Sequence, residues 1–273
     1  MTIRFWGVRG SIPSPGPQTV RYGGNTTCVT VEHEGTLLIL DAGTGLFRLG
    51  QALREAPRGL DLVLMFSHRH LDHVSSFPFF WPLWQPGRTL HLVDYTHEGE
   101  VWSPLDLLDG VLYPMTPSMV AATCHRVADG PAFLAPRGFH VRTMPLNHPG
   151  GAYGYRITCA EKTWVHLTDN ELDAADGAPF ETFVAFCQGA DVLTHDAHLV
   201  ASDLPGKAGW GHTRIRRAAD LARAAQAKHL VLIHHAPERT DDELDALQAE
   251  VRAYLAPHGI ACTAAYEGLA IEL

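Results

Sequence analysis

One histidine-rich segment constrains most strongly what this chain of 273 residues can fold into: Ser67-His68-Arg69-His70-Leu71-Asp72-His73. The segment directly follows the apolar run Leu62 to Phe66, which is typical of a buried β-strand. Because alternate side chains of an extended segment point the same way, His68 and His70 can both reach one ion. Asp72 and His73 lie just past the strand end and can turn toward a second position. These ligand-type side chains therefore predict half of a metal site.

Further candidate ligands follow later apolar runs, as a complete metal site would require. His148 follows the run Val141 to Leu146, Asp169 follows the run Trp164 to Thr168, and His234 with His235 follows the run His229 to Ile233. Short apolar runs bounded by Gly, Pro and Asp are typical of strands. Ligand-type side chains are therefore expected at successive strand ends.

Helix-like segments alternate with these strand-like runs, without an internal repeat or a linker. Thr213 to Ala227 has small residues at three- and four-residue spacing, which predicts a helix that packs closely on a sheet. A capping box of Thr240 and Glu243 starts a second helix, and Leu46 to Arg54 is expected to form a third. We therefore predict one α/β domain over residues 1–273.

Residues 75–135 are the least regular part of the chain. Phe77 to Trp84 is crowded with aromatic side chains, and Trp102 to Gly130 has little clear periodicity. We predict an irregular insertion or lid near the site, with the aromatic stretch as a wall of the substrate pocket. A satellite hydrophobic cluster under a long loop is the alternative.

Composition limits the partners and the compartment. With 30 acidic and 21 basic residues the formal charge is −9, which argues against a general nucleic-acid binder and against an anionic-membrane binder. The five cysteines are scattered and odd in number, so they suggest neither a disulfide framework nor a thiolate zinc site. The N-terminus shows no basic region followed by an apolar core. We expect a soluble, cytoplasmic protein.

The order of the candidate ligands resembles a known series. His-x-His-x-Asp-His, then a lone His, an Asp and a terminal His is similar to the ligand series of the metallo-β-lactamase fold, a four-layered αββα sandwich. The resemblance covers most of the chain and favours His234 over His235 as the last ligand. It implies two metal ions, the first held by His68, His70 and His148, the second by Asp72, His73 and His234, with Asp169 bridging both.

The ligand types bear on the metal and on the reaction. Nitrogen and carboxylate ligands without a thiolate suit zinc, with manganese or iron as alternatives. Oxygen-reducing di-iron members of this fold have a glutamate where this chain has His70, so the resemblance implies hydrolysis rather than redox chemistry. Two such ions can share a hydroxide at neutral pH and clamp the attacking and leaving oxygens, which suits phosphodiester hydrolysis. Asp72 is expected to orient the nucleophile.

A second segment, Gly209-Trp210-Gly211-His212-Thr213, points to the same chemistry. It is similar to the Gly-His-Ser/Thr segment of the phosphodiesterase branch of this fold, which includes ribonuclease Z. The resemblance implies that His212 is a general acid that protonates the leaving alkoxide. The alternative is a capping or packing histidine at the start of a helix.

The N-terminal part adds a further likeness. Phe5 to Pro13 and Tyr22 to Cys28 look like the opening of bacterial proteins related to cyclic-nucleotide and phosphoribosyl cyclic phosphodiesterases. Arg9 and Lys207 are candidates for a phosphate contact, with a structural ion pair as the alternative.

We therefore predict a dinuclear metal-dependent phosphodiesterase that hydrolyses a small cyclic or linear phosphodiester. No long, basic Gly/Pro-rich arm of the kind that holds transfer RNA is present, so we expect a small-molecule substrate, no general nucleic-acid binding and no membrane partner. Two alternatives stay open: a hydrolase of the same fold acting on a thioester, lactone or β-lactam, and a non-catalytic metal-dependent binder.

Overall fold

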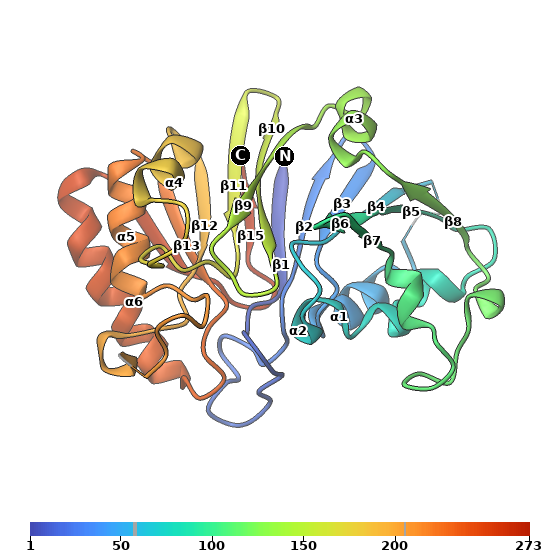
Figure 1. Ribbon diagram of the computed structural model, residues 1–273, viewed down its shortest axis with the longest axis horizontal. Coiled ribbons are helices and arrows are strands. Elements are labelled where there is room, and N and C mark those ends of the chain that lie inside the picture. Colours follow the sequence, from blue (N-terminus) through green and yellow to red (C-terminus); the bar gives the residue numbers. More distant parts are fainter. Residues whose placement is uncertain (57–58, 205) are drawn as a thin grey trace.

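Two β-sheets pack face to face, and helices cover the outer face of each sheet (Figure 1). The computed structural model describes residues 1–56, 59–204 and 206–273. The predicted four-layered αββα sandwich is thereby confirmed. Within the described ranges, no helix has the length and apolar character that crossing a bilayer requires.

The sheets are built in a definite strand order. In the described residues the first sheet has the order β15 (Ala270–Glu272), β1 (Thr2–Gly7), β2 (Cys28–His33), β3 (Thr36–Leu40), β4 (Asp61–Met65), β5 (Thr89–Val93) and β8 (Thr123–Val127). The second has the order β14 (Ala261–Ala264), β13 (His229–Ile233), β12 (Val192–Asp196), β11 (Lys162–Leu167), β10 (Ala152–Cys159) and β9 (His140–Leu146). A separate hairpin pairs β6 (Tyr95–His97) with β7 (Glu100–Trp102).

Strand direction brings the predicted ligands to one edge of the sandwich. Strands β3, β4, β5 and β8 run parallel in the first sheet, and β11, β12, β13 and β14 run parallel in the second. Strand β9 pairs antiparallel with β10, which pairs antiparallel with β11, so β9 and β11 run the same way. The carboxyl ends of parallel strands meet at one edge of a sheet, where α/β proteins bind their ligands. The predicted metal ligands all follow such ends.

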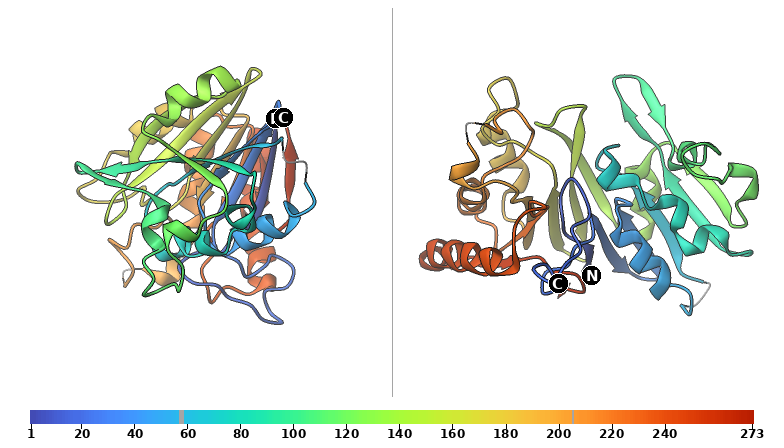
Figure 2. Two further views of the ribbon diagram at one scale, coloured as in Figure 1. Left: turned by 90° about the vertical axis from the view of Figure 1, so that its right-hand side faces the viewer. Right: turned by 90° about the horizontal axis from the view of Figure 1, so that it is seen from below.

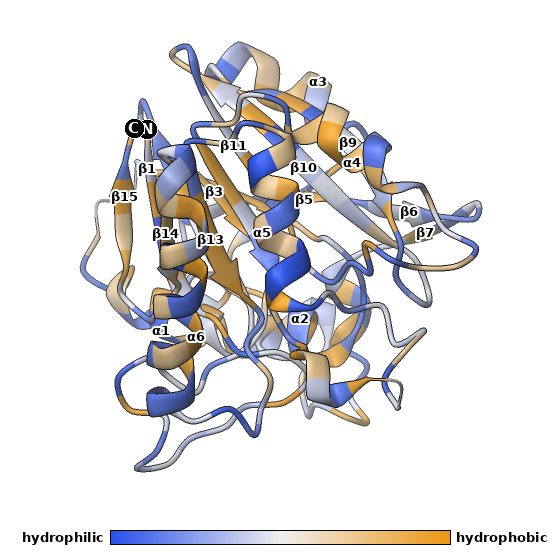
Figure 3. Ribbon diagram, turned by 90° about the vertical axis from the view of Figure 1, so that its left-hand side faces the viewer, coloured by the Kyte–Doolittle hydropathy of each residue, from blue (hydrophilic) through white to orange (hydrophobic). Residues whose placement is uncertain are grey.

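The helices cover the sheets with apolar faces, and the polar faces of α5 and α6 turn outward (Figure 3). Helix α5 buries Ala218, Ala219 and Ala222, as its small-residue spacing predicts. Helix α6 starts at the predicted capping box, in which Thr240 and Glu243 bond each other's backbone N–H. The helices are α1 (Gly45–Ala52), α2 (Leu71–Val74), α3 (Gly130–Leu134), α4 (Phe180–Cys187), α5 (Ile215–Ala224) and α6 (Asp241–Leu255). Short 3₁₀ turns are η1 (Phe77–Phe79), η2 (Trp81–Trp84), η3 (Pro104–Leu107), η4 (Pro117–Met119), η5 (Ala135–Arg137), η6 (Ala201–Asp203) and η7 (Ala256–His258).

The inner faces of the two sheets share one apolar layer. Phe5, Val63, Trp164 and Val231 are fully buried in it. The chain ends meet on the first sheet, where β1 pairs with β15, and both termini lie together in Figure 2. This layer holds the two sheets, and therefore their strand ends, in a fixed relation.

Residues 75–135, predicted as an insertion or lid, form parts of the first sheet and its core and a hairpin beside the site. They supply β5 and β8 to the first sheet and the hairpin of β6 and β7, which lies beside the site. Phe77 and Phe80 are fully buried in the apolar cluster that contains Leu46 and Leu49 of α1. The expectation that the aromatic stretch walls the pocket is therefore wrong for Phe77 and Phe80, whose rings pack into the core, and the cavity beside His148 is lined by other residues.

Candidate metal centre

The histidine-rich segment leaves β4 and turns into the short helix α2 at His70. The rings of His68 and His70 lie 4.6 Å apart between centroids, on the same side of the segment. Asp72 and His73 lie in the first turn of α2, which redirects them toward a second position, as the sequence predicts. His68 and His73 are fully or almost fully buried, whereas His70 is partly exposed at the mouth of the site.

Asp41 fixes this segment from the neighbouring strand end. Its carboxylate accepts hydrogen bonds from the backbone N–H of Ser67 at 2.7 Å and from the Ser67 hydroxyl at 2.8 Å. It also lies 2.9 Å from Nδ1 of His73, which leaves Nε2 of that ring to face the site. Asp41 has a positive φ of 64°, an uncommon backbone state that is often found at functional sites. The sequence motifs did not single out this residue, although its position after β3 matches the strand-end pattern of the predicted ligands.

The first group of ligand atoms comes from β4, β9 and β11. His68, His70, His148 and Asp169 each offer one atom, and all four atoms lie within 4.8 Å of one another. Nε2 of His148 is 3.0 Å from Nδ1 of His70. Oδ2 of Asp169 is 3.6 Å from Nε2 of His68 and 3.7 Å from Nε2 of His148. Side chains far apart in the sequence therefore converge on one position.

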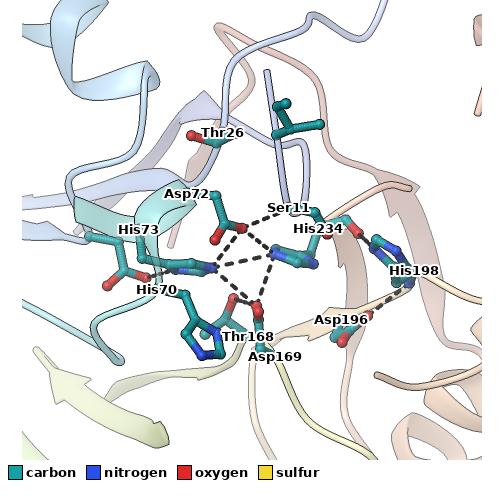
Figure 4. Close-up of polar contacts among 12 residues, drawn as sticks. Ser11, Thr26, His70, Asp72, His73, Thr168, Asp169, Asp196, His198 and His234 are labelled. Atoms are coloured by element: carbon teal, nitrogen blue, oxygen red, sulfur yellow. Dashed lines mark hydrogen bonds and ion pairs between the residues drawn. The ribbon is translucent and has the colours of Figure 1, made fainter. Parts of the chain in front are cut away.

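The second group, Asp72, His73, Asp169 and His234, shares Asp169 with the first. Figure 4 shows the contacts among these four side chains. Nε2 of His234 lies 3.0 Å from Oδ1 of Asp169 and 3.1 Å from Oδ2 of Asp72. Nε2 of His73 lies 3.3 Å from each of the same two carboxylates. The two carboxyl oxygens of Asp169 thus face different groups, which is the arrangement that a bridging ligand requires.

The two adjacent histidines after β13 point in different directions. His234 enters the second group with a positive φ of 61°. Nε2 of His235 lies 2.9 Å from the carbonyl oxygen of Ala265, on the other side of the strand. The geometry therefore favours His234 as the residue that faces the site.

The chemistry of these groups fits divalent metal ions. Nε2 of His68 is buried and has no hydrogen-bond partner among the described residues, although it faces Asp169. Burial lowers the pKa values of His68, His70 and His148, which favours the neutral imidazole that metals bind. The buried, shared carboxylate and these neutral imidazoles form a donor set of the type that holds divalent ions.

Both carboxylates of the site are held in the charged form. Burial opposes ionisation of Asp169, but the imidazoles of His234 and His73 keep its pKa well below the usual range. Burial likewise opposes ionisation of Asp72, and His73 and His234 lower its pKa. Asp72 also accepts a hydrogen bond of 2.7 Å from the backbone N–H of Ser11, in the N-terminal loop. Two negative charges are therefore available to neutralise bound cations.

His212, the predicted general acid, stands at the border of this cluster. Its ring stacks on His234 at 5.1 Å and on His198 at 4.3 Å between centroids. Nδ1 of His212 is 2.8 Å from Oδ2 of Asp196, a fully buried carboxylate at the end of β12. Burial opposes a charge on the imidazole, but Asp196 outweighs it and raises the pKa of His212 to about 9. The Asp196 carboxylate therefore favours the protonated form of the imidazole beside the cluster.

Arg9 and Lys207 make structural contacts. The fully buried Arg9 guanidinium donates hydrogen bonds to the carbonyl oxygens of Gly23, Ala236 and Arg239. It thereby ties the N-terminal loop to the segment that follows His235. Lys207 is 2.9 Å from Glu238. Arg9 thus takes the structural role that the sequence left as an alternative to a phosphate contact.

A cavity of about 670 Å³ opens beside the first group of ligand atoms. It lies between the hairpin of β6 and β7 and the turn after β9, and it is lined by Arg69, His97, Glu98, Glu100, Leu146, His148, Gly150 and Gly151. Arg69 lies 3.3 Å from Glu100, so it links the histidine-rich segment to the hairpin. The cavity gives a substrate access to His148 and its neighbours.

An αββα sandwich with buried His and Asp ligands at its strand-end edge defines a metal-dependent hydrolase of the metallo-β-lactamase fold. The chain belongs to the beta-lactamase superfamily, because the family model described as "Beta-lactamase superfamily domain" matches residues 36–235. The predicted family and fold are thereby confirmed.

Curated relatives match over nearly the whole chain. Ribonuclease BN of Cronobacter sakazakii is 32% identical, and the alignment covers 93% of this chain and 95% of the relative. Ribonuclease Z of Natronomonas pharaonis is 23% identical over 86% of each chain. Among solved structures, the metallo-beta-lactamase fold protein YhfI from Bacillus subtilis has a TM-score of 0.69 at 19% identity and covers 100% of this chain and 99% of its own.

These relatives correct one prediction from the sequence. A small-molecule substrate without nucleic-acid binding was expected from the formal charge of −9 and from the lack of a basic arm. That expectation is wrong, because the relatives are named as ribonucleases. Net charge averages over the whole surface, whereas an enzyme contacts its substrate at one face, so an acidic total does not exclude a nucleic-acid substrate.

Proposed function

We propose that this protein is a dinuclear metal-dependent phosphodiesterase that cleaves phosphodiester bonds of RNA. The observation that supports this most is the pair of ligand groups that share Asp169, with His212 beside them. Two adjacent cations and a proton donor are the parts that an in-line displacement at phosphorus needs. The ribonuclease relatives, which align with most of the chain, support RNA as the substrate.

The residues of the two groups have separate roles in this proposal. His68, His70 and His148 would hold one ion, Asp72, His73 and His234 would hold the other, and Asp169, which belongs to both groups, would be shared between them. Zinc suits this set of nitrogen and oxygen ligands. When bound, such ions lower the pKa of a water nucleophile and neutralise charge on the phosphoryl oxygens.

The protein's own side chains orient and protonate the reacting groups. Asp72 accepts a hydrogen bond from the nucleophile and keeps it in line with the phosphorus. The Ser11 N–H restrains this carboxylate by donating to Oδ2, the oxygen that also faces His73 and His234. His212 gives its proton to the leaving alkoxide, and Asp196 holds the imidazole in the orientation that presents Nε2.

The contact between Gly211 and His148 predicts how one substitution would change metal affinity. The carbonyl oxygen of Gly211 lies 3.0 Å from Nδ1 of His148, and a Cβ on Gly211 would overlap that ring. Gly211→Ala should therefore displace His148 and weaken metal affinity by about 10- to 100-fold, the usual cost of disturbing a ligand's support. Chelator competition followed by metal analysis measures this.

Gly209 supplies the matched control. Its φ of +81° equals that of Gly211 within a degree, but a Cβ there meets open space. Gly209→Ala carries the same backbone strain without touching His148, so its metal affinity should stay near that of the wild type. Equal losses in both variants would mean that loop strain, and not the His148 contact, sets the affinity.

The proposed reaction is tested with metal-loaded protein on four kinds of substrate. These are a short single-stranded RNA, bis-p-nitrophenyl phosphate, a thioester and the β-lactam nitrocefin. Cleavage of the two phosphodiesters, with little turnover of the other two, is expected. Turnover of the thioester or nitrocefin without cleavage of either phosphodiester would show that the site hydrolyses a different kind of bond. That result would overturn the proposal.

A further inference from the structure

An exposed tryptophan stands beside the candidate general acid and has no role in the proposed reaction. Trp210 is 57% exposed, the most exposed of the six tryptophans, all of which the structure describes. Aromatic side chains on which bases stack are common contacts of proteins that bind single-stranded nucleic acids. We propose that Trp210 is a stacking platform for a nucleobase of the RNA substrate, an inference that rests on the proposed phosphodiesterase function.

The backbone on both sides of Trp210 is tied down. The N–H groups of Gly209 and Gly211 both donate to the carboxylate of Glu171, at 3.0 Å and 2.9 Å. The carbonyl of Gly211 also contacts the His148 ring. Both glycines have a φ above +80°, a backbone state that other residues rarely adopt. Trp210 therefore projects from a loop that is fixed at both flanks, so little conformational entropy is lost when a ligand stacks on it.

Trp210 lies two residues before His212, the proposed proton donor to the leaving group. Two peptide units separate Trp210 from His212, so their Cα atoms lie at most about 7.6 Å apart. His212 protonates the leaving oxygen in the proposed reaction, and the leaving nucleoside begins at that oxygen. We therefore assign the base that stacks on Trp210 to the leaving-group nucleotide, whose oxygen His212 protonates in the proposed reaction.

The charge next to the ring suits a nucleotide. Nζ of Lys207 lies 5.9 Å from the centroid of the Trp210 ring and is paired with Glu238. A cation near an aromatic ring adds a favourable interaction with its π face. More than half of Trp210 remains accessible, which leaves surface for a base. Stacking on aromatic side chains tolerates any base, because each base has a π face.

The test compares two RNA substrates that differ in one group. The first is a short single-stranded RNA, and the second carries an abasic ribose in its leaving-group nucleotide. With metal-loaded wild-type protein, KM should be about 5- to 150-fold higher for the abasic RNA, the range that stacking of one base on an aromatic ring provides. In Trp210→Ala the two KM values should become equal, and Trp210→Phe should restore part of the difference.

Trp81 gives the matched control, since it is 38% exposed and packs against Arg54, away from His212. Trp81→Ala should keep the wild-type ratio of KM values. Equal KM values for both RNAs in the wild type would overturn the platform and leave the phosphodiesterase proposal standing. A wild-type protein that cleaves neither RNA nor bis-p-nitrophenyl phosphate would overturn both.

Discussion

Replacing Asp169 by asparagine is expected to lower phosphodiester turnover by more than about 10³-fold, as loss of one member of a cooperating catalytic unit does. The reason is that the two oxygens of Asp169 face different ligand groups, so one neutral amide weakens both positions. Metal bound per chain should fall in parallel. Steady-state kinetics and inductively coupled plasma mass spectrometry measure the two effects on the same sample.

Asp173 provides the control for this substitution. It lies four residues further along the chain, is partly exposed, and pairs with Arg214 and Arg217 instead of with the cluster. Asp173→Asn should bind metal and turn over substrate like the wild type. An Asp169→Asn protein that keeps two ions and full turnover would show that Asp169 does not bridge the ions.

His212→Ala is expected to reduce cleavage of RNA by about 10²- to 10⁴-fold, the usual contribution of a positioned general acid. The leaving group in RNA is an alkoxide, which departs poorly without a proton. Nitrophenolate needs little protonation, so bis-p-nitrophenyl phosphate should lose much less. Equal losses on both substrates would contradict proton donation and would indicate a structural role for this histidine.

The pH profile tests the same residue through its partner. Asp196 raises the pKa of His212 to about 9, so the acid stays protonated at neutral pH and the rate should fall as pH rises through that value. Asp196→Asn removes the charge that raises this pKa, and the decline should therefore start at lower pH. If Asp196→Asn leaves the decline of the rate at high pH unchanged, a group other than His212 causes that decline.

The sequence predicts most of the site because its ligands obey one rule. Each candidate follows an apolar run, and parallel strands bring such positions to one edge, as β4, β11 and β13 do. Asp41 obeys the same rule after β3, but an aspartate before Ala-Gly is also typical of an ordinary turn, so the sequence does not distinguish the two roles. Its role depends on hydrogen bonds to Ser67 and His73 that no spacing reveals.

Other features depend on packing that composition does not show. The family resemblance favours His234 over His235, but the positive φ at which His234 enters the site is not predicted by alternation along a strand. Phe77 and Phe80 of the aromatic stretch fill the core under α1, whereas Phe79 and Trp81 stay exposed, and composition does not distinguish the two kinds of position. The substrate class was misjudged for a related reason, since total charge says nothing about one face of the molecule.

The proposed reaction requires two metal ions that act together at the site sharing Asp169. Metal-depleted protein is titrated with Zn²⁺ while bound metal and RNA cleavage are followed on the same samples. We predict that turnover is small with one ion per chain and reaches its plateau with two. Full turnover at one ion, or two bound ions without any turnover, would contradict the claim.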